Sequence, residues 1–180
     1  MAEPEQRLPS GHVVRETEGA VCTLRFDRPA KKNALTVAMY QDLVATLRAV
    51  REDPAIRVVR FAGAPGIFTA GNDLGDFMMR PPTGEDSPVL QLLMLLVGFE
   101  KPLVAAVDGP AVGLGATMLL HCDLVVATER TRLQMPFVKL GLVPEAASSL
   151  LLPRVAGLQR ASEWLLLGEP FPAARPTPRA

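Results

Sequence analysis

Hydrophobic and polar positions alternate with two different periods along the N-terminal half of the chain. The pair Val13-Val14 and the run from Val21 to Phe26 predict two strands joined as a hairpin. From Val37 to Val50, apolar residues recur every three or four positions, which predicts one face of a helix. Thr36 stands just before that face and can cap the helix. The pattern therefore predicts a hairpin followed by a long amphipathic helix.

Further along, short apolar runs end at glycine or proline and are followed by helical patterns. The predicted strands are residues 56–62, 102–107, 124–128 and 131–134, and the predicted helices are residues 90–99, 113–121, 148–155 and 158–167. Residues 78–88 predict a loop. Strands that alternate with helices favour an α/β fold in which helices cover a sheet. We expect one core domain at residues 11–168, between a flexible N-terminus at 1–10 and a proline-rich tail at 169–180.

Composition narrows the class of protein without identifying it. The 180 residues are 48% hydrophobic and 21% charged, with a formal net charge of zero, which suits one globular domain with a sizeable core. A balanced charge disfavours nucleic acid or an anionic membrane as the main partner. The longest apolar run is too short to span a bilayer. With only two histidines and two distant cysteines, we expect a cytoplasmic protein without a metal site.

Two glycine-bearing segments can present backbone N–H groups to a ligand. Residues 68–74 follow a predicted strand, and their small side chains let a ligand approach the backbone. Residues 108–116 end a strand and start a helix, whose first turn carries unpaired N–H groups that suit an oxyanion. An ordinary strand-to-helix turn also explains the first segment, and close helix packing also explains the second. Each segment alone leaves both explanations open.

A third segment, residues 141–149, contains a single carboxylate among small and apolar neighbours. Pro144 fits the first position of a helix and Glu145 the second. A surface glutamate would stabilise the helix dipole, whereas burial would raise the pKa of its carboxyl group, and the sequence leaves both open. His121-Cys122-Asp123 and Ser148-Ser149 invite comparison with a catalytic triad. That histidine and aspartate are too close in sequence for the usual geometry, and no GxSxG motif is present.

Taken together, the segments resemble the crotonase superfamily, which includes enoyl-CoA hydratases and isomerases. The resemblance runs from about Val21 to Gly168 and follows the family's motifs in order and spacing. Those motifs are Phe26-Asp27-Arg28-Pro29, Asn33-Ala34-Leu35, residues 68–74, 101–120, 122–127 and 136–141, and Pro144-Glu145. The resemblance implies a crotonase-like spiral of ββα repeats that binds an acyl-CoA thioester.

The resemblance also implies site residues. Two backbone N–H groups stabilise an enolate in this family, and by motif they belong to Asn72 and Leu114. The residues that match substrate-binding positions are Ala34, Ala70, Gly71, Asp73, Leu74 and Gly113. Coenzyme A is part of the substrate, so the resemblance implies no separate cofactor.

One departure from the family pattern bears on the reaction. Hydratases hold a water molecule with two glutamates, and Thr117 and Phe137 occupy those positions here. Glu145 matches instead the single catalytic glutamate of peroxisomal-type Δ3,Δ2-enoyl-CoA isomerases, for which one carboxylate suffices. We therefore expect proton transfer beside a thioester, with isomerisation favoured over a hydration in which Glu145 activates water alone.

A second departure lies towards the C-terminal end. The run Gly168-Glu169-Pro170-Phe171 resembles the family's approach to a further helix, but a proline-rich stretch follows. We expect the C-terminal helical part to be truncated, which leaves a catalytically weak acyl-CoA-binding remnant as an alternative function. The resemblance implies a homotrimer or a dimer of trimers, although the segment that usually builds such assemblies is the missing one.

Overall fold

The computed structural model describes residues 4–81, 84 and 86–173, in which strands and helices alternate. The strands are β1 (Gln6–Arg7), β2 (Val13–Glu18), β3 (Val21–Phe26), β4 (Val58–Ala62), β5 (Leu103–Val107), β6 (Pro110–Val112), β7 (Leu124–Ala127), β8 (Arg132–Gln134) and β9 (Phe171–Pro172). The helices are α1 (Val37–Glu52), α2 (Leu74–Met79), α3 (Pro88–Val97), α4 (Leu114–Thr117), α5 (Ser148–Ala156) and α6 (Leu158–Leu167), with short 3-10 helices η1 (Pro29–Lys31), η2 (Met118–His121) and η3 (Val138–Leu140). The predicted α/β class is confirmed.

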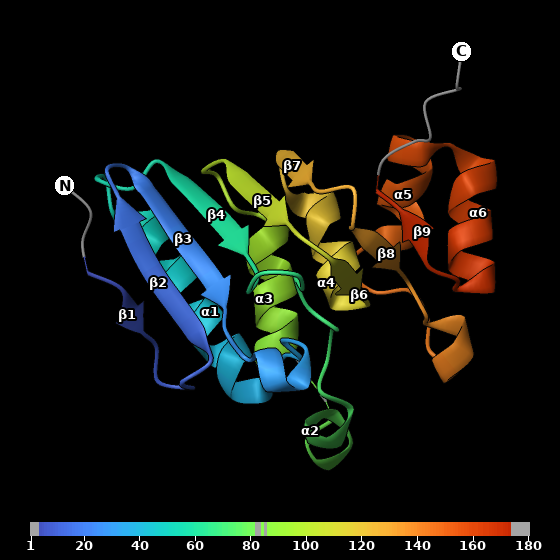
Figure 1. The fold of residues 1–180 in the computed structure, drawn as a ribbon, viewed down its shortest axis with the longest axis horizontal. Coiled ribbons are helices and arrows are strands. Elements are labelled where there is room, and N and C mark those ends of the chain that lie inside the picture. The colour runs from blue at the N-terminus through green and yellow to red at the C-terminus, as the bar shows by residue number, and fades with distance from the viewer. Residues whose placement is uncertain (1–3, 82–83, 85, 174–180) are drawn as a thin grey trace.

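Two sheets organise these elements. The main sheet has the strand order β1-β2-β3-β4-β5-β7, in which the first three strands are antiparallel and β3, β4, β5 and β7 are parallel. The smaller sheet has the order β6-β8-β9. Figure 1 shows α1 and α3 side by side behind the main sheet, and α5 and α6 beside the smaller sheet. The main sheet is therefore covered by helices on one face, as a parallel sheet with crossover helices requires.

The apolar face predicted for the first helix is the face that α1 buries. Thr36 caps the helix, since its hydroxyl oxygen accepts a hydrogen bond from the Met39 amide at 3.3 Å. Leu47 of α1, Leu92 of α3 and Phe61 of β4 have no exposed surface and belong to one hydrophobic cluster. Burying each such side chain contributes about 1.5–3 kcal/mol to folding, so this cluster fixes the helices on the sheet.

Each of two main-sheet strands continues into a strand of the smaller sheet and then into a helix. β5 leads through β6 to α4, and β7 leads through β8 to η3 and α5. β6 and β8 pair in parallel, in register from Pro110 with Arg132 to Val112 with Gln134. These are the ββα repeats that the resemblance implies.

Several predicted boundaries were wrong for local reasons. The predicted end of the strand at Val107 is confirmed, but the sequence missed β6, which begins at Pro110. Part of the expected loop at 78–88 is helical, because Asp73 caps α2 by accepting hydrogen bonds from the amides of Gly75 and Asp76. The expected helix at 113–121 divides into α4 and the 3-10 helix η2. Helix α3 is apolar at every position but Gln91, yet it buries only one face, since Met94 is 71% exposed.

Secondary structure also occurs in both end ranges. β1 lies within residues 1–10, the range expected to be a flexible N-terminus, and pairs with β2. β9 lies within the proline-rich range 169–180 and pairs with β8. Phe171 of β9 stacks on Trp164 of α6 with ring centroids 3.8 Å apart. The assigned limits of the core domain stay a prediction, but the strand pairing extends past residues 11 and 168.

No helix in the described part of the chain is long and apolar enough to cross a bilayer. The same residues contain no group of three or more His, Cys, Asp or Glu side chains placed to hold a metal ion.

Asn33 joins the loop after β3 to the loop after β4. Its side chain is fully buried, and its backbone has a φ of 53°. Its Oδ1 accepts a hydrogen bond from the Arg28 amide at 2.7 Å, and its Nδ2 donates to the carbonyl oxygens of Ile67 and Phe68 at 3.0 and 3.1 Å. One amide side chain therefore fixes two loops that approach the same end of the sheet.

We expect Asn33→Ala to lower the free energy of unfolding by about 3 kcal/mol or more, because buried backbone groups lose their partners and alanine is disfavoured at positive φ. Lys32→Ala is the matched control, since Lys32 also has a positive φ of 51° but an exposed side chain. The control should stay within about 0.5 kcal/mol of the wild type. Urea unfolding of both variants measures the difference, and equal losses would contradict the role given to the Asn33 amide.

Candidate active site

The first glycine-bearing bend, residues 69–73, is held by backbone and side-chain hydrogen bonds. The Leu35 amide donates to the Gly71 carbonyl oxygen, and the Asp73 amide donates to the Leu35 carbonyl oxygen, both at 2.8 Å. In this parallel bridge the N–H of Asn72 points away from Leu35. The Gly71 amide donates to Thr69 Oγ1 at 3.0 Å, and that hydroxyl donates to the Asn33 carbonyl oxygen at 2.6 Å. The bend therefore presents the Asn72 amide in a fixed direction.

The second bend joins β6 to α4. Gly113 has a φ of 56° and stands immediately before the helix. Leu114 is the first helical residue, so its N–H has no acceptor within the helix. In the described part of the chain, neither the Asn72 amide nor the Leu114 amide donates a hydrogen bond to a protein group. Both N–H groups therefore lack a protein acceptor, although Leu114 itself has no exposed surface.

The two bends lie directly against each other. A Cβ atom built on Gly71 would lie 2.5 Å from the Val112 carbonyl oxygen and 3.6 Å from the Gly113 Cα. A Cβ atom built on Gly115 would lie 2.4 Å from Thr69 Cγ2. Only glycines allow such an approach of two backbone segments. The residues that carry the two unused amides thus follow directly after the point of contact.

The sequence predicted that Glu145 lies in the first turn of a helix. In the structure it lies instead in a turn before α5. The helix begins at Ser148, and Ala146 and Ala147 adopt left-handed φ angles of 53° and 51°. Burial raises the pKa of the Glu145 carboxyl group to about 7. Its Oε1 is buried and has no hydrogen-bond partner among the described residues. The sequence left open whether Glu145 is a surface residue that stabilises the helix dipole or a buried one with a raised pKa. The structure supports the second alternative.

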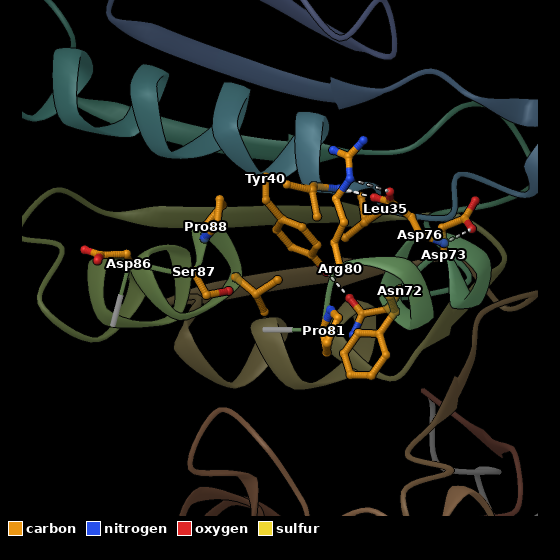
Figure 2. Close-up of a pocket in the computed structure, with 13 residues that line it drawn as sticks. Leu35, Tyr40, Asn72, Asp73, Asp76, Arg80, Pro81, Asp86, Ser87 and Pro88 are labelled. Atoms are coloured by element: carbon orange, nitrogen blue, oxygen red, sulfur yellow. Dashed lines mark hydrogen bonds and ion pairs between the residues drawn. The ribbon is translucent and has the colours of Figure 1, made fainter. Parts of the chain in front are cut away.

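Tyr40 connects Glu145 with the first bend. It extends from α1, where its side chain is buried, and its hydroxyl donates a hydrogen bond to Asn72 Oδ1 (Figure 2). Burial raises the pKa of the Tyr40 hydroxyl well above its ordinary value, and the charge of Glu145 raises it further. The charge of Glu145 thus acts on a hydroxyl group that is hydrogen-bonded to Asn72, and the three residues come from three separate elements.

The sequence identified Tyr40 only as one position of an apolar helix face. It is the only tyrosine of the chain. A tyrosine hydroxyl that enters a core normally needs a hydrogen-bond partner. This requirement was the sequence signal that could have identified Tyr40 as a site residue. The identity of that partner depends on the tertiary structure.

A cavity of about 220 Å³ opens beside Tyr40 and Asn72 (Figure 2). Its other lining residues are Leu35, Val37, Asp73, Asp76, Phe77, Arg80, Pro81, Asp86, Ser87, Pro88 and Val89. A second cleft, of about 720 Å³, lies between β7, β8, α5 and α6 and is lined by none of the predicted site residues. The smaller cavity therefore adjoins the first bend, where Asn72 and Asp73 line it, whereas Leu114 and Glu145 line neither cavity.

The remaining predicted binding residues gather near the first bend. Arg28 Nη1 donates to the Ala34 carbonyl oxygen at 3.0 Å and to Asp73 Oδ2 at 2.7 Å. The hydrogen bond from Arg28 holds the pKa of the Asp73 carboxyl group below its ordinary value, and backbone amides of α2 add to this effect. The Ala70 amide donates to the Lys32 carbonyl oxygen at 2.9 Å. Leu74 begins α2 and is 58% exposed, so its side chain can meet a ligand at the surface.

The two positions that carry glutamates in hydratases are apolar in character here. Thr117 is fully buried, and its hydroxyl donates only a long hydrogen bond of 3.4 Å to the Leu114 carbonyl oxygen. Phe137 is 5% exposed and belongs to a hydrophobic cluster with Met135 and Leu152. Neither position therefore offers a carboxylate to a water molecule.

Comparison with known proteins decides the family. The sequence profile described as enoyl-CoA hydratase/isomerase matches residues 16–176. The chain belongs to this family. Its curated relatives include enoyl-CoA delta isomerase 2 of Rattus norvegicus, 39% identical over 163 residues, and 4-chlorobenzoyl coenzyme A dehalogenase-2 of an Arthrobacter species, 35% identical over 162 residues. The names of these two relatives indicate different reactions, one an isomerisation and the other a dehalogenation.

Solved structures confirm the crotonase fold. The chain superposes on OdaA of Pseudomonas aeruginosa with a TM-score of 0.86 at 51% identity, covering 89% of this chain and 65% of that one. It superposes on an enoyl-CoA hydratase/isomerase from Pseudoalteromonas atlantica T6c with a TM-score of 0.86 at 41% identity, covering 90% and 64%. The matches cover 87% of this chain and 41% of the rat isomerase, and 86% of this chain and 59% of the dehalogenase. The chain therefore spans about half the length of these curated relatives.

We expect Gly71→Ala to destabilise the protein by about 1–3 kcal/mol more than Gly66→Ala, because only the first change forces a Cβ against the Val112 carbonyl oxygen. Gly66 is the matched control: its φ of 83° is close to the 81° of Gly71, but open space surrounds its Cβ position. Denaturant unfolding of both variants measures the difference. Equal destabilisation would mean that the two bends do not press on each other.

We also expect Glu145→Gln to change how stability depends on pH. The folded pKa of about 7 lies above the ordinary 4.5, so the folded state holds the proton more tightly than the unfolded state. The contribution of Glu145 to wild-type stability should be greatest below pH 4.5 and be lost as the pH rises through 7. At pH 8 the Gln variant should exceed the wild type by about 2–3 kcal/mol, and at pH 4 the two should nearly coincide.

Urea unfolding at a series of pH values measures this effect. Glu163→Gln is the control, because Glu163 lies exposed on α6 and the same substitution there should leave the wild-type pH dependence intact. A Glu145→Gln variant that loses stability with pH as the wild type does would refute the burial of a charged carboxylate.

Proposed function

We propose that this chain acts on acyl-CoA thioesters and moves a proton beside the thioester, with Δ3,Δ2-enoyl-CoA isomerisation as the reaction. The observation that carries the proposal is the Glu145 carboxyl group, which is buried, has an oxygen without a partner, and has a pKa of about 7. A carboxyl group with a pKa near neutrality can both remove and return a proton. Tyr40 links this group to Asn72, whose unused amide belongs to the first bend.

The two bends supply the electrostatic part of the mechanism. The thioester carbonyl oxygen accepts hydrogen bonds from the amides of Asn72 and Leu114. Both donors are backbone groups fixed before the substrate arrives, so no reorganisation is needed as negative charge develops on that oxygen. In other enzymes one such donor contributes about 10²–10³ in rate.

Glu145 supplies the proton transfer. Its carboxylate removes a proton from C2 of a 3-enoyl-CoA, and the electrons of the broken C–H bond form a dienolate with the charge on the thioester oxygen. The protonated Glu145 then delivers the same proton to C4, while the double bond moves from C3–C4 to C2–C3. The reaction neither gains nor loses atoms and needs no cofactor beyond the coenzyme A of the substrate.

The names of the relatives support the class of substrate. Enoyl-CoA delta isomerase 2 and 4-chlorobenzoyl coenzyme A dehalogenase-2 are both named for a coenzyme A thioester. Thr117 and Phe137 favour isomerisation over hydration, because neither side chain carries a carboxylate that could take a proton from a water. A catalytically weak acyl-CoA-binding protein is the second candidate, since neither hydratase carboxylate is present. We infer a homotrimer or a dimer of trimers from the family, which light scattering can test.

The test is turnover of a panel of 2-enoyl- and 3-enoyl-CoAs with product identification, together with deuterium exchange at C2. We expect Glu145→Gln to lower isomerisation and exchange by about 10²–10⁴-fold, because an amide cannot accept the C2 proton. Glu163→Gln, on the exposed face of α6, should retain wild-type rates. In the wild type, kcat/KM should rise with pH to a plateau above about 7, where Glu145 is ionised.

Three results would contradict the assignment in different ways. Undiminished exchange by Glu145→Gln removes Glu145 as the acid/base. Hydration of a 2-enoyl-CoA as the main reaction favours a hydratase. Tight binding of acyl-CoA without turnover favours the binding protein.

A further inference from the structure

The turn that carries Glu145 is strained. Ala146 and Ala147 are two successive alanines in the left-handed region, which residues with a Cβ atom normally avoid. Such a conformation persists only where surrounding contacts impose it. The contacts that impose it here come from two residues outside the proposed mechanism.

Ser148 holds the first carbonyl group of the turn. Its side chain is fully buried, and its Oγ donates a hydrogen bond of 2.6 Å to the Glu145 carbonyl oxygen. Its backbone amide donates to the same oxygen at 2.9 Å. The backbone of Glu145 is thereby fixed to the start of α5.

His121 holds the second carbonyl group. Its Nε2 lies 2.9 Å from the Ala146 carbonyl oxygen, and because a carbonyl oxygen only accepts, this nitrogen carries a hydrogen. His121 is the last residue of η2, which follows α4 without a break and packs against α5. Leu114 is the first residue of α4. One short helical segment therefore carries the second unused amide at its start and the ring that holds the Glu145 turn at its end.

These contacts also give a structural role to the residues that invite comparison with a catalytic triad in the sequence. His121 and Ser148 do come together, but each binds a different carbonyl oxygen of the same turn. The Asp123 carboxylate instead accepts a hydrogen bond from the Leu103 amide at 2.8 Å, at the edge of the main sheet. The pair thus supports the backbone and forms no nucleophile.

We propose that His121 is a positioning residue, which with Ser148 holds the strained 145–147 turn so that the Glu145 carboxylate keeps its place relative to the Leu114 amide. The inference rests on the proposed function for its catalytic consequence, while the hold on the turn itself stands on the contacts. Misplacement of a catalytic group by about 1 Å can lower a rate by about 10²-fold. Of the titratable groups on the packed elements, the Tyr40 hydroxyl of α1 feels the charge of Glu145, and the His121 ring binds the carbonyl oxygen of the next residue, Ala146.

The test compares His121→Phe, which keeps a ring but removes the donor, with His121→Gln, whose Nε2 can reach the same carbonyl oxygen. His12→Phe is the matched control, since His12 is the other histidine of the chain and precedes β2. We expect His121→Phe to lower kcat for C2 exchange by about 10²-fold with KM changed less than about 3-fold. Water should then reach the released carboxyl group, so the midpoint of the pH–rate profile should fall below 7.

His121→Gln should retain most of the activity and the wild-type midpoint, and His12→Phe should match the wild type. A loss of kcat in His121→Phe with an unchanged midpoint would indicate general destabilisation and overturn the proposal. Should His121→Phe fail to fold, His121→Asn takes its place, because its shorter amide cannot reach the carbonyl oxygen; equal activity of the Asn and Gln variants would also overturn it.

A readout independent of turnover separates this inference from the proposed function. The backbone amides of Ala146 and Ala147, followed by NMR against pH, report the ionisation of Glu145 in any folded variant. A shifted titration in His121→Phe together with no turnover by the wild type would reject the proposed function and keep the role of His121. An unshifted titration would reject the role of His121 whatever the activity.

Discussion

The contact between two backbone bends is the constraint on which the candidate site depends. Gly71 leaves no room for a Cβ against the Val112 carbonyl oxygen, and Gly115 leaves none against Thr69. This contact places the free amides of Asn72 and Leu114 on adjoining segments. It exists because β4 and β5 are neighbouring parallel strands, so the bends that follow them leave the sheet at the same edge. The sheet thus sets the position of two donors that need no particular side chain.

The acid/base candidate is held at a cost to stability. Burial opposes the charge of Glu145, one of its oxygens has no partner, and two alanines beside it adopt a disfavoured conformation. Each of these features weakens the folded state, and the hydrophobic clusters must offset them. A carboxyl group placed at the surface would avoid the penalty, but its pKa would stay near the ordinary value. At neutral pH such a carboxylate is a weak base and takes up a proton poorly. The unfavourable burial is therefore what makes the group suitable for proton transfer.

The sequence predicted the parts of this design that depend on local pattern. The helix from Val37, the parallel strands and both glycine-bearing bends follow from periodicity and from glycine positions, and the structure contains them. The resemblance added Glu145 as the acid/base, and this role stays a prediction. The misses depend on tertiary contacts. The turn at 144–147 reads as the start of a helix because Pro144 and Glu145 suit one locally. The hydrogen bond from His121 that shapes this turn spans 25 residues, and no sequence period reports it.

The loss of the hydratase carboxylates has a structural counterpart. Phe137 belongs to the cluster that contains Leu152 of α5 and Ala161 of α6. Helix α5 begins directly after the Glu145 turn, so the apolar side chain at position 137 helps to seat the helix that presents the remaining carboxylate. A glutamate at position 137 would place a charge inside that cluster and weaken the support of the turn. The two positions are therefore coupled through packing, because the apolar side chain at 137 stabilises the helix that follows the Glu145 turn.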